Sequence, residues 1–154
     1  MKAESLIRQL ASEGKTLSTA ESCTGGLLGA LLTEVSGASQ VYLGGVVSYA
    51  YSVKEALLGV DSALLTEKGA VCEEVAVQRA EGVRRALGAD FALSVTGNAG
   101  PGTDEKNPKV GEIFVACADA TGSRCLRLQC NGSRQEKRLT ACDAAISLLL
   151  NTLK

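Results

Sequence analysis

The stretch TLSTAESCTGGLLGALLTEV, residues 16–35, decides the expected fold class of this chain. Residues 16–20 predict a short strand, and the leucines that follow Gly26 recur at the spacing of one broad, buried helix face. The segment Glu-Ser-Cys-Thr-Gly-Gly between them is therefore expected on a strand-to-helix turn. Because α/β proteins bind ligands at the carboxyl ends of their strands, Ser22 on this turn is the first candidate for chemistry.

The sequence on both sides of this stretch continues the alternation of helices and strands. Further helices are predicted over residues 3–13, 54–60, 63–68, 73–87 and from Ser133 to the end, and further strands over Val41–Tyr49, Phe91–Thr96, 112–118 and 124–130. The strand Val41–Tyr49 is expected to be buried, and Gly97–Gly111 to form a long loop. The order predicts a single α/β domain over residues 1–154, with a mixed sheet and helices on both faces.

Composition argues against several classes of partner. The net charge of −1, the lack of a basic run and an aromatic content of 3% disfavour nucleic-acid binding. Charged residues within Met1–Gly14 exclude a signal peptide, and no apolar run approaches the roughly 18 residues of a membrane span. Six cysteines without a CxxC pair, and no histidine, predict reduced thiols in a cytoplasmic protein with no metal and no cofactor.

The lack of histidine also removes Ser-His-Asp and Cys-His catalysis. Ser22 could still be a nucleophile, with free N–H groups of the turn stabilising an oxyanion and Gly25 and Gly26 allowing close backbone approach. The structural alternative is that Ser22 or Thr24 simply caps the helix. Cys23 is a rival nucleophile whose side chain we expect to point into the core.

Lys54 is the candidate base, since it follows the strand predicted to be buried. A lysine accepts a proton only when neutral, so its pKa must fall from about 10.4 towards 7, at a cost of about 4 kcal/mol. Tyr49 could relay a proton or orient the lysine. The alternatives are a surface lysine beside Glu55 and a tyrosine that only packs against the strand.

Two further segments could bind an anion. Gly97–Gly102 follows a strand and is rich in glycine, although it lacks the Lys-Ser/Thr ending of a phosphate loop, and a structural turn fits it equally well. Arg134 and Arg138 lie one turn apart at the start of the last helix, where they could bind a phosphate or a carboxylate, or could face solvent.

Six stretches together carry a resemblance to a known family. They are TAESCTGG (19–26), VVSYAYSVKEALLGV (46–60), GAVCEEV (69–75), SVTGNAGP (94–101), VGEIFVA (110–116) and GSRQEKR (132–138). In this order they resemble the CinA C-terminal domain family, whose enzymatic members are nicotinamide mononucleotide deamidases. The resemblance covers roughly residues 3–153 and implies a three-layer α/β/α sandwich.

The resemblance also implies site residues. By this likeness Ser22 is the nucleophile, Lys54 its base and Tyr49 an auxiliary group. Thr24 and the turn amides of Gly25 and Gly26 would hold an oxyanion or a phosphate, together with Gly97. Arg138, with Arg134, would meet the nucleotide phosphate. The expected partners are a small-molecule nucleotide substrate and further copies of the same chain, with no nucleic acid and no membrane.

The chain departs from the family pattern at two places near these residues. It has Tyr49-Ala50-Tyr51-Ser52-Val53-Lys54 where the family usually has Tyr-Ser-Asn-x-x-Lys, and Gly132-Ser133-Arg134 where the family has Gly-Asp-Arg. The segment Asp104–Lys109 is also unusual. Two alternatives therefore stay open: a non-catalytic binding domain linked to competence or damage response, and an amidase of another small amide.

Overall fold

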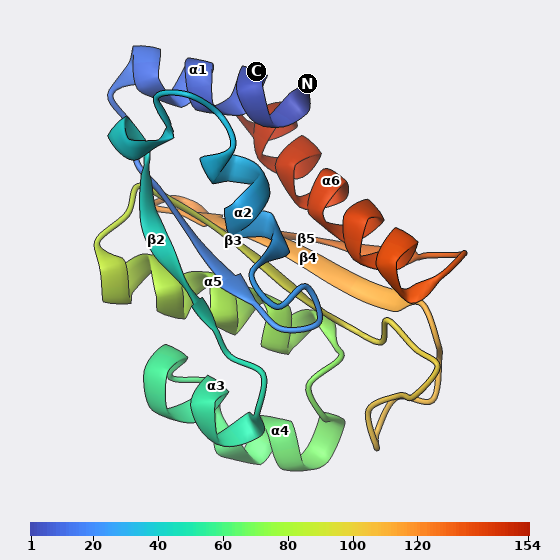
Figure 1. The fold of residues 1–154 in the computed structure, drawn as a ribbon. Coiled ribbons are helices and arrows are strands. Elements are labelled where there is room, and N and C mark those ends of the chain that lie inside the picture. Colours follow the sequence, from blue (N-terminus) through green and yellow to red (C-terminus); the bar gives the residue numbers. More distant parts are fainter.

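The computed structural model describes residues 1–154 as a five-stranded sheet with helices on both faces (Figure 1). The helices are α1 Lys2–Glu13, α2 Leu27–Thr33, the 3-10 turn η1 Ala38–Gln40, α3 Tyr51–Leu58, α4 Ser62–Lys68, α5 Glu73–Leu87 and α6 Arg134–Thr152. The strands are β1 Leu17–Glu21, β2 Tyr42–Val47, β3 Phe91–Gly97, β4 Glu112–Asp119 and β5 Gly122–Gln129. The predicted α/β class with a mixed sheet is confirmed. None of the helices has both the length and the apolar character needed to cross a lipid bilayer.

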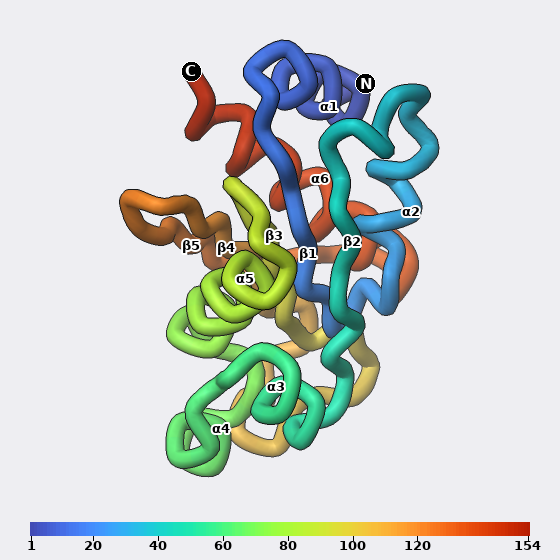
Figure 2. Tube along the Cα trace, turned by 90° about the vertical axis from the view of Figure 1, so that its left-hand side faces the viewer, coloured from blue at the N-terminus to red at the C-terminus, as the bar shows by residue number.

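The strand order β2-β1-β3-β4-β5 determines where a site can form. β1 runs parallel to both of its neighbours, β2 and β3, whereas β4 runs antiparallel to both of its neighbours, β3 and β5. From β1 the chain moves outward to β2 through α2, then returns past β1 to β3 through α3, α4 and α5 (Figures 1 and 2). The carboxyl ends of β1 and β3 therefore flank the point where the strand order reverses, which is where open α/β sheets bind ligands.

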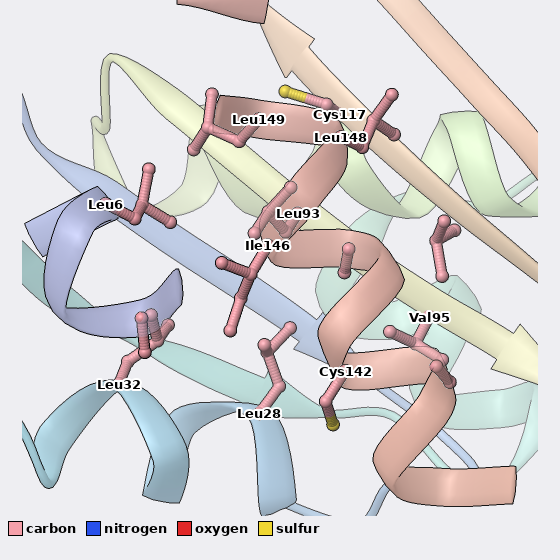
Figure 3. Close-up of a cluster of buried hydrophobic side chains, with 14 of the residues drawn as sticks. Leu6, Leu28, Leu32, Leu93, Val95, Cys117, Cys142, Ile146, Leu148 and Leu149 are labelled. Carbon is pink, nitrogen blue, oxygen red and sulfur yellow. The ribbon is translucent and has the colours of Figure 1, made fainter. Parts of the chain in front are cut away.

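The two faces of the sheet are packed differently. Helices α1, α2 and α6 cover one face over a core cluster of 23 buried residues, in which Leu28, Leu93 and Leu149 are fully buried (Figure 3). On the other face α5 lies close to the sheet, because small residues meet there: Ala76 and Ala80 of the helix cluster with alanines of β4. The larger core thus fixes α2 and α6, and the tighter packing fixes α5.

The structure corrects one prediction about a strand. Val41–Tyr49 was expected to be buried, but β2 covers only Tyr42–Val47 and forms the edge of the sheet, with half-buried and exposed residues alternating. Leu43 and Val47 are about half exposed. An apolar composition shows β propensity but does not distinguish an edge strand from a central one. Tyr49 consequently lies beyond the strand, and α3 begins at Tyr51 instead of Lys54.

Candidate active site

Ser22 and Lys54 meet at the switch point of the sheet. Ser22 directly follows β1 and is 8% exposed, while Lys54 lies in the first turn of α3 and is 1% exposed. The Nζ of Lys54 is 3.3 Å from the Oγ of Ser22. Both side chains border a cavity of about 530 Å³, which is within the usual range for small-molecule sites.

Backbone carbonyls fix the position of the Lys54 amine. Its Nζ donates to the carbonyl of Ser48 at 2.7 Å and to that of Tyr49 at 2.8 Å. A neutral amine has two N–H bonds and one lone pair. With its two hydrogens on these carbonyls, the lone pair is left for the third neighbour, Ser22. The geometry therefore suits an amine that accepts the serine proton.

The environment of Lys54 favours this neutral form. Burial lowers the pKa of Lys54 to about 8, with a further contribution from the positive charge of Arg79 and a smaller opposing one from Asp104. Removing the amine from water penalises its charged form, and a nearby cation penalises it further. A substantial fraction of the Lys54 side chain is thus uncharged at pH values slightly above 7.

The turn that carries Ser22 is held from two sides. The buried carboxylate of Glu21 accepts hydrogen bonds from the backbone N–H groups of Gly26, Leu28 and Gly29, at 2.8–3.1 Å. On the other side the guanidinium of Arg138 donates to the carbonyl of Cys23 at 3.0 Å and to that of Thr24 at 2.9 Å. Gly25 and Gly26 adopt φ of 58° and 109°, so the turn needs glycine at both positions.

These contacts change the expected roles of the turn residues. The N–H of Gly26 already donates to Glu21, and the N–H of Gly25 donates to the carbonyl of Ser22, so neither is free for a substrate. The hydroxyl of Thr24 is buried without a partner, and Thr24 does not line the cavity. The backbone N–H groups of Ser22, Cys23 and Thr24 donate to no protein acceptor. The free donors therefore lie at residues 22–24, before the two glycines that the sequence suggested.

Cys23 is poorly suited to compete as a nucleophile. Its side chain packs into the larger core, as expected, although it also borders the cavity. Burial raises the pKa of the Cys23 thiol to about 11, against the lowering effect of nearby arginines. Because the thiolate is the reactive form, this cysteine stays unreactive at neutral pH.

The two tyrosines before Lys54 have different surroundings. Tyr49 is 66% exposed, and it is its carbonyl, not its phenol, that contacts Lys54. The phenol of Tyr51, in α3, donates to the carboxylate of Asp104, on the loop after β3, at 2.6 Å, and both residues line the cavity. Desolvation, followed by this carboxylate, raises the pKa of Tyr51 to about 12. Tyr51 therefore remains a hydrogen-bond donor throughout the neutral range.

Residues 97–104, at the end of β3 and on the loop after it, also line the cavity. The Asn98 side chain donates to the carbonyls of Asn107 at 2.9 Å and Lys109 at 3.1 Å, and accepts from the N–H of Asp104 at 2.8 Å. The Asn107 amide in turn donates to the carbonyl of Val71 and to the buried carboxylate of Glu112. This long loop is thus held by the amide side chains of two asparagines.

The structure brings some of the predicted binding residues to the cavity and leaves others outside it. Gly97 and Arg134 line the cavity, and Arg134 donates to the carbonyl of Gly100 at 2.8 Å. Arg138 does not line it, since its guanidinium is engaged with the Ser22 turn and with Gln135.

Sequence reasoning missed Arg79, although a signal was available. Arg79 lies in α5 and is fully buried among Val75, Ala76, Ala80 and Val83. Val75, Ala76 and Val83 are three or four positions from Arg79, so they share its helix face. A charge on such a face is rare in a core, and checking that face would have identified it.

Glu21 and Asp104 were missed for different reasons. Glu21 ends a buried strand immediately before the turn, where a carboxylate can satisfy helix N–H groups, so its role could have been anticipated. The contact of Asp104 with Tyr51 joins residues 53 positions apart and has no local sequence signal.

Fold and site together define an α/β/α protein with a buried serine–lysine pair at the switch point of its sheet. The chain matches the family model described as "CinA C-terminal domain" over residues 1–153. The chain therefore belongs to the CinA C-terminal domain family, as its sequence motifs indicated.

Individual relatives agree with this assignment. The chain is 46% identical over 144 residues to a "CinA-like protein" of Salinibacter ruber. The aligned region covers 94% of this chain and 35% of that protein. Among solved structures it is similar to the competence/damage inducible protein CihA from Agrobacterium tumefaciens (35% identity, TM-score 0.90, 100% of this chain and 97% of that one). It is also similar to a CinA superfamily protein from Escherichia coli (28% identity, TM-score 0.93, 97% and 87%). The chain spans between 26% and 36% of the length of the curated relatives it matches.

Proposed function

We propose that this domain is an amidohydrolase that converts nicotinamide mononucleotide to nicotinic acid mononucleotide and ammonia. The observation that carries the proposal is the buried Lys54 amine, 3.3 Å from the Ser22 hydroxyl and held by two carbonyls. A serine becomes a nucleophile when an adjacent base removes its proton, and a lysine with a pKa of about 8 can act as that base. The family resemblance supplies the substrate.

The first half of the reaction forms an acyl-enzyme. The Oγ of Ser22 attacks the carboxamide carbon while the hydroxyl proton passes to the Nζ of Lys54. The unpaired N–H groups of Ser22, Cys23 and Thr24 are the available donors for the oxyanion that develops. When the intermediate collapses, the C–N bond breaks and the Lys54 ammonium returns the proton to the departing nitrogen, so that ammonia leaves.

The second half regenerates the enzyme. Lys54 is neutral again and removes a proton from a water molecule, which attacks the ester carbonyl of the acyl-enzyme. The ester C–O bond then breaks, the proton returns to Ser22 and the free carboxylic acid leaves. Tyr49 is the auxiliary group in this proposal: it lines the cavity, and its carbonyl fixes the amine.

The arginines have different roles in this proposal. We assign the nucleotide phosphate to Arg134, because this residue borders the cavity and has further N–H donors besides the one that it gives to Gly100. Arg138 acts as a positioning residue, because it holds the carbonyls of Cys23 and Thr24 in the turn.

The test is ammonia release from nicotinamide mononucleotide, with the acid product followed by chromatography. Ser22→Ala should lower kcat by at least about 10³-fold, as loss of a nucleophile does in other hydrolases. Its stability should change little, because the Ser22 hydroxyl is not a cap and its only hydrogen bond is with Lys54. The matched control is Ser12→Ala on the exposed surface of α1, which should leave kcat unchanged.

Other results would redirect the proposal. Ammonia from a different small amide but not from the mononucleotide would keep the serine–lysine chemistry and replace the substrate. Absence of ammonia from every pyridine amide tested would favour a binding domain. Activity that persists in Ser22→Ala would remove the nucleophile.

A further inference from the structure

Arg79 is a buried cation without an anionic partner. It lies in the middle of α5, exposes none of its surface and forms no ion pair. Its guanidinium donates to the hydroxyl of Ser48 at 2.9 and 3.1 Å and to the carbonyl of Val95. Burial lowers the pKa of Arg79 to about 10, so the guanidinium remains charged at neutral pH.

Such a residue is expensive for the fold. Burying an ion costs several kcal/mol even after relaxation, and hydrogen bonds to neutral oxygens offset only part of this. An apolar side chain of similar volume would suit a face made of Val75, Ala76, Ala80 and Val83. Residues that break the local packing pattern at such a cost are expected at functional sites.

Ser48 links Arg79 to the proposed base. The Ser48 hydroxyl accepts from Arg79, and the carbonyl of the same residue accepts from the Lys54 Nζ at 2.7 Å. The Ser48 N–H donates to the carbonyl of Glu21, the residue before Ser22, at 2.8 Å. One residue thus joins the buried cation, the base and the strand end that carries the nucleophile.

We propose that Arg79 is a positioning residue that keeps the Lys54 amine neutral and directed at Ser22, through its charge and through its hold on Ser48. The proposal rests on the assignment of Lys54 as the catalytic base. A fixed positive charge in the low-dielectric interior opposes protonation of a neighbouring amine, as it does for other activated lysines. The position of Ser48, in turn, determines which way the amine's lone pair points.

The other charged and titratable groups around the amine act in the opposite direction. Asp104, on the loop after β3, favours the protonated amine. Cys23, on the turn after β1, would do so as a thiolate, but its raised pKa keeps it a neutral thiol. Glu21 acts on Arg79 itself, whose charged form it favours. Among these groups Arg79 alone opposes protonation of Lys54.

The experiment measures the titration of Lys54 directly and without substrate. In protein labelled with ¹³C-lysine, the Cε signal of Lys54 is identified by its loss in Lys54→Met. The chemical shift of this signal is then recorded against pH in wild type, Arg79→Met and Arg79→Lys, which gives the titration midpoint of Lys54 in each. Arg79→Met should raise the midpoint by about one pH unit, which lowers the neutral fraction about tenfold at pH 7. Arg79→Lys keeps a charge at this position and should titrate near the wild type.

The pH profile of kcat/KM provides the second measurement. In Arg79→Met it should fall about tenfold at pH 7 and recover above the new midpoint, which a purely structural role would not produce. Replacing a buried ion with a methionine is often neutral or stabilising, so this variant should fold. Arg79→Gln, which also removes the charge, is the substitute if thermal melting shows otherwise.

The outcomes separate this inference from the proposed function. A Lys54 midpoint that stays the same in a folded Arg79→Met or Arg79→Gln overturns the role of Arg79, whatever the activity. If wild type releases no ammonia, the deamidase proposal fails, while the titration still decides whether Arg79 controls the lysine.

Discussion

The two sides of the cavity are built by different means. We call Ser22, Cys23 and Lys54 the nucleophile wall, and residues 97–104 the loop wall. The nucleophile wall follows directly from a central strand and a helix, and its amine is held by backbone carbonyls. The loop wall has little regular structure and is held by the side chains of Asn98 and Asn107. Backbone carbonyls therefore fix the amine of the first wall, and the side chains of Glu21 and Arg138 hold the turn beside it. The second wall depends on the side chains of two asparagines.

This difference predicts that the walls control different kinetic constants. Changes to the nucleophile wall should lower kcat, because its groups act on the reacting atoms. Changes to the loop wall should mainly raise KM, because its groups shape the space around the substrate.

The largest effect is expected for Lys54→Met in the nucleophile wall. Loss of a general base costs about 10²- to 10⁴-fold in rate, so kcat should fall by that amount with little change in KM. In wild type, kcat/KM should rise with pH through a midpoint near the Lys54 pKa of about 8. Lys15→Met, on an exposed lysine, is the matched control. Full activity in Lys54→Met, or a rate that is flat from pH 5 to 9, would place the base elsewhere.

The same lysine should leave a signature in stability. Its pKa is about 8 in the fold against 10.5 for the unperturbed side chain, so between these pH values the unfolded chain binds a proton that the native chain lacks. Stability therefore rises with pH across this window, by at most about 3 kcal/mol, and the contribution is smallest below pH 8. Urea unfolding at pH 7, 8.5 and 10 should show this rise in wild type relative to Lys54→Met.

A smaller effect is expected for Asn107→Ala, which supports the loop wall. It removes donors to the carbonyl of Val71 and to the carboxylate of Glu112, leaving both with fewer partners. Stability should fall by about 1–3 kcal/mol, and KM should rise about tenfold as the loop loosens. Asn151→Ala, on the exposed end of α6, is the control. A fall in kcat as large as the rise in KM would mean that the two walls are not independent.

The two walls also differed in how well the sequence predicted them. Hydrophobic periodicity located the strand before Ser22 and the helix after it, and the family motifs indicated Lys54 and Tyr49. The strand end and the turn are local features, and local features leave a pattern. Even here the sequence did not reveal that the Glu21 carboxylate accepts hydrogen bonds from the backbone N–H groups at the start of α2. Those bonds depend on the rotamer of one side chain.

The loop wall could be predicted only as a loop between Gly97 and Gly111. Its shape depends on contacts between residues distant in sequence, such as Asn107 with Val71 and Tyr51 with Asp104. No periodicity or spacing encodes such pairs. Arg79 lies between these two cases: its helix face was visible in the sequence, whereas its neighbours Ser48 and Lys54 required the fold.

The smallest effect is expected for Tyr51→Phe, because Tyr51 joins the helix that carries Lys54 to the loop wall. The lost hydrogen bond to Asp104 is at a position that is 37% exposed, so its loss should raise KM by no more than about threefold. Because the pKa of Tyr51 is raised to about 12, the effect should be equal at pH 7 and pH 9. Tyr49→Phe is the informative comparison: if the Tyr49 phenol is the auxiliary group, this variant lowers kcat while Tyr51→Phe does not. A loss of kcat in Tyr51→Phe alone would transfer the auxiliary role to Tyr51 and place part of the chemistry on the contact between α3 and the loop wall.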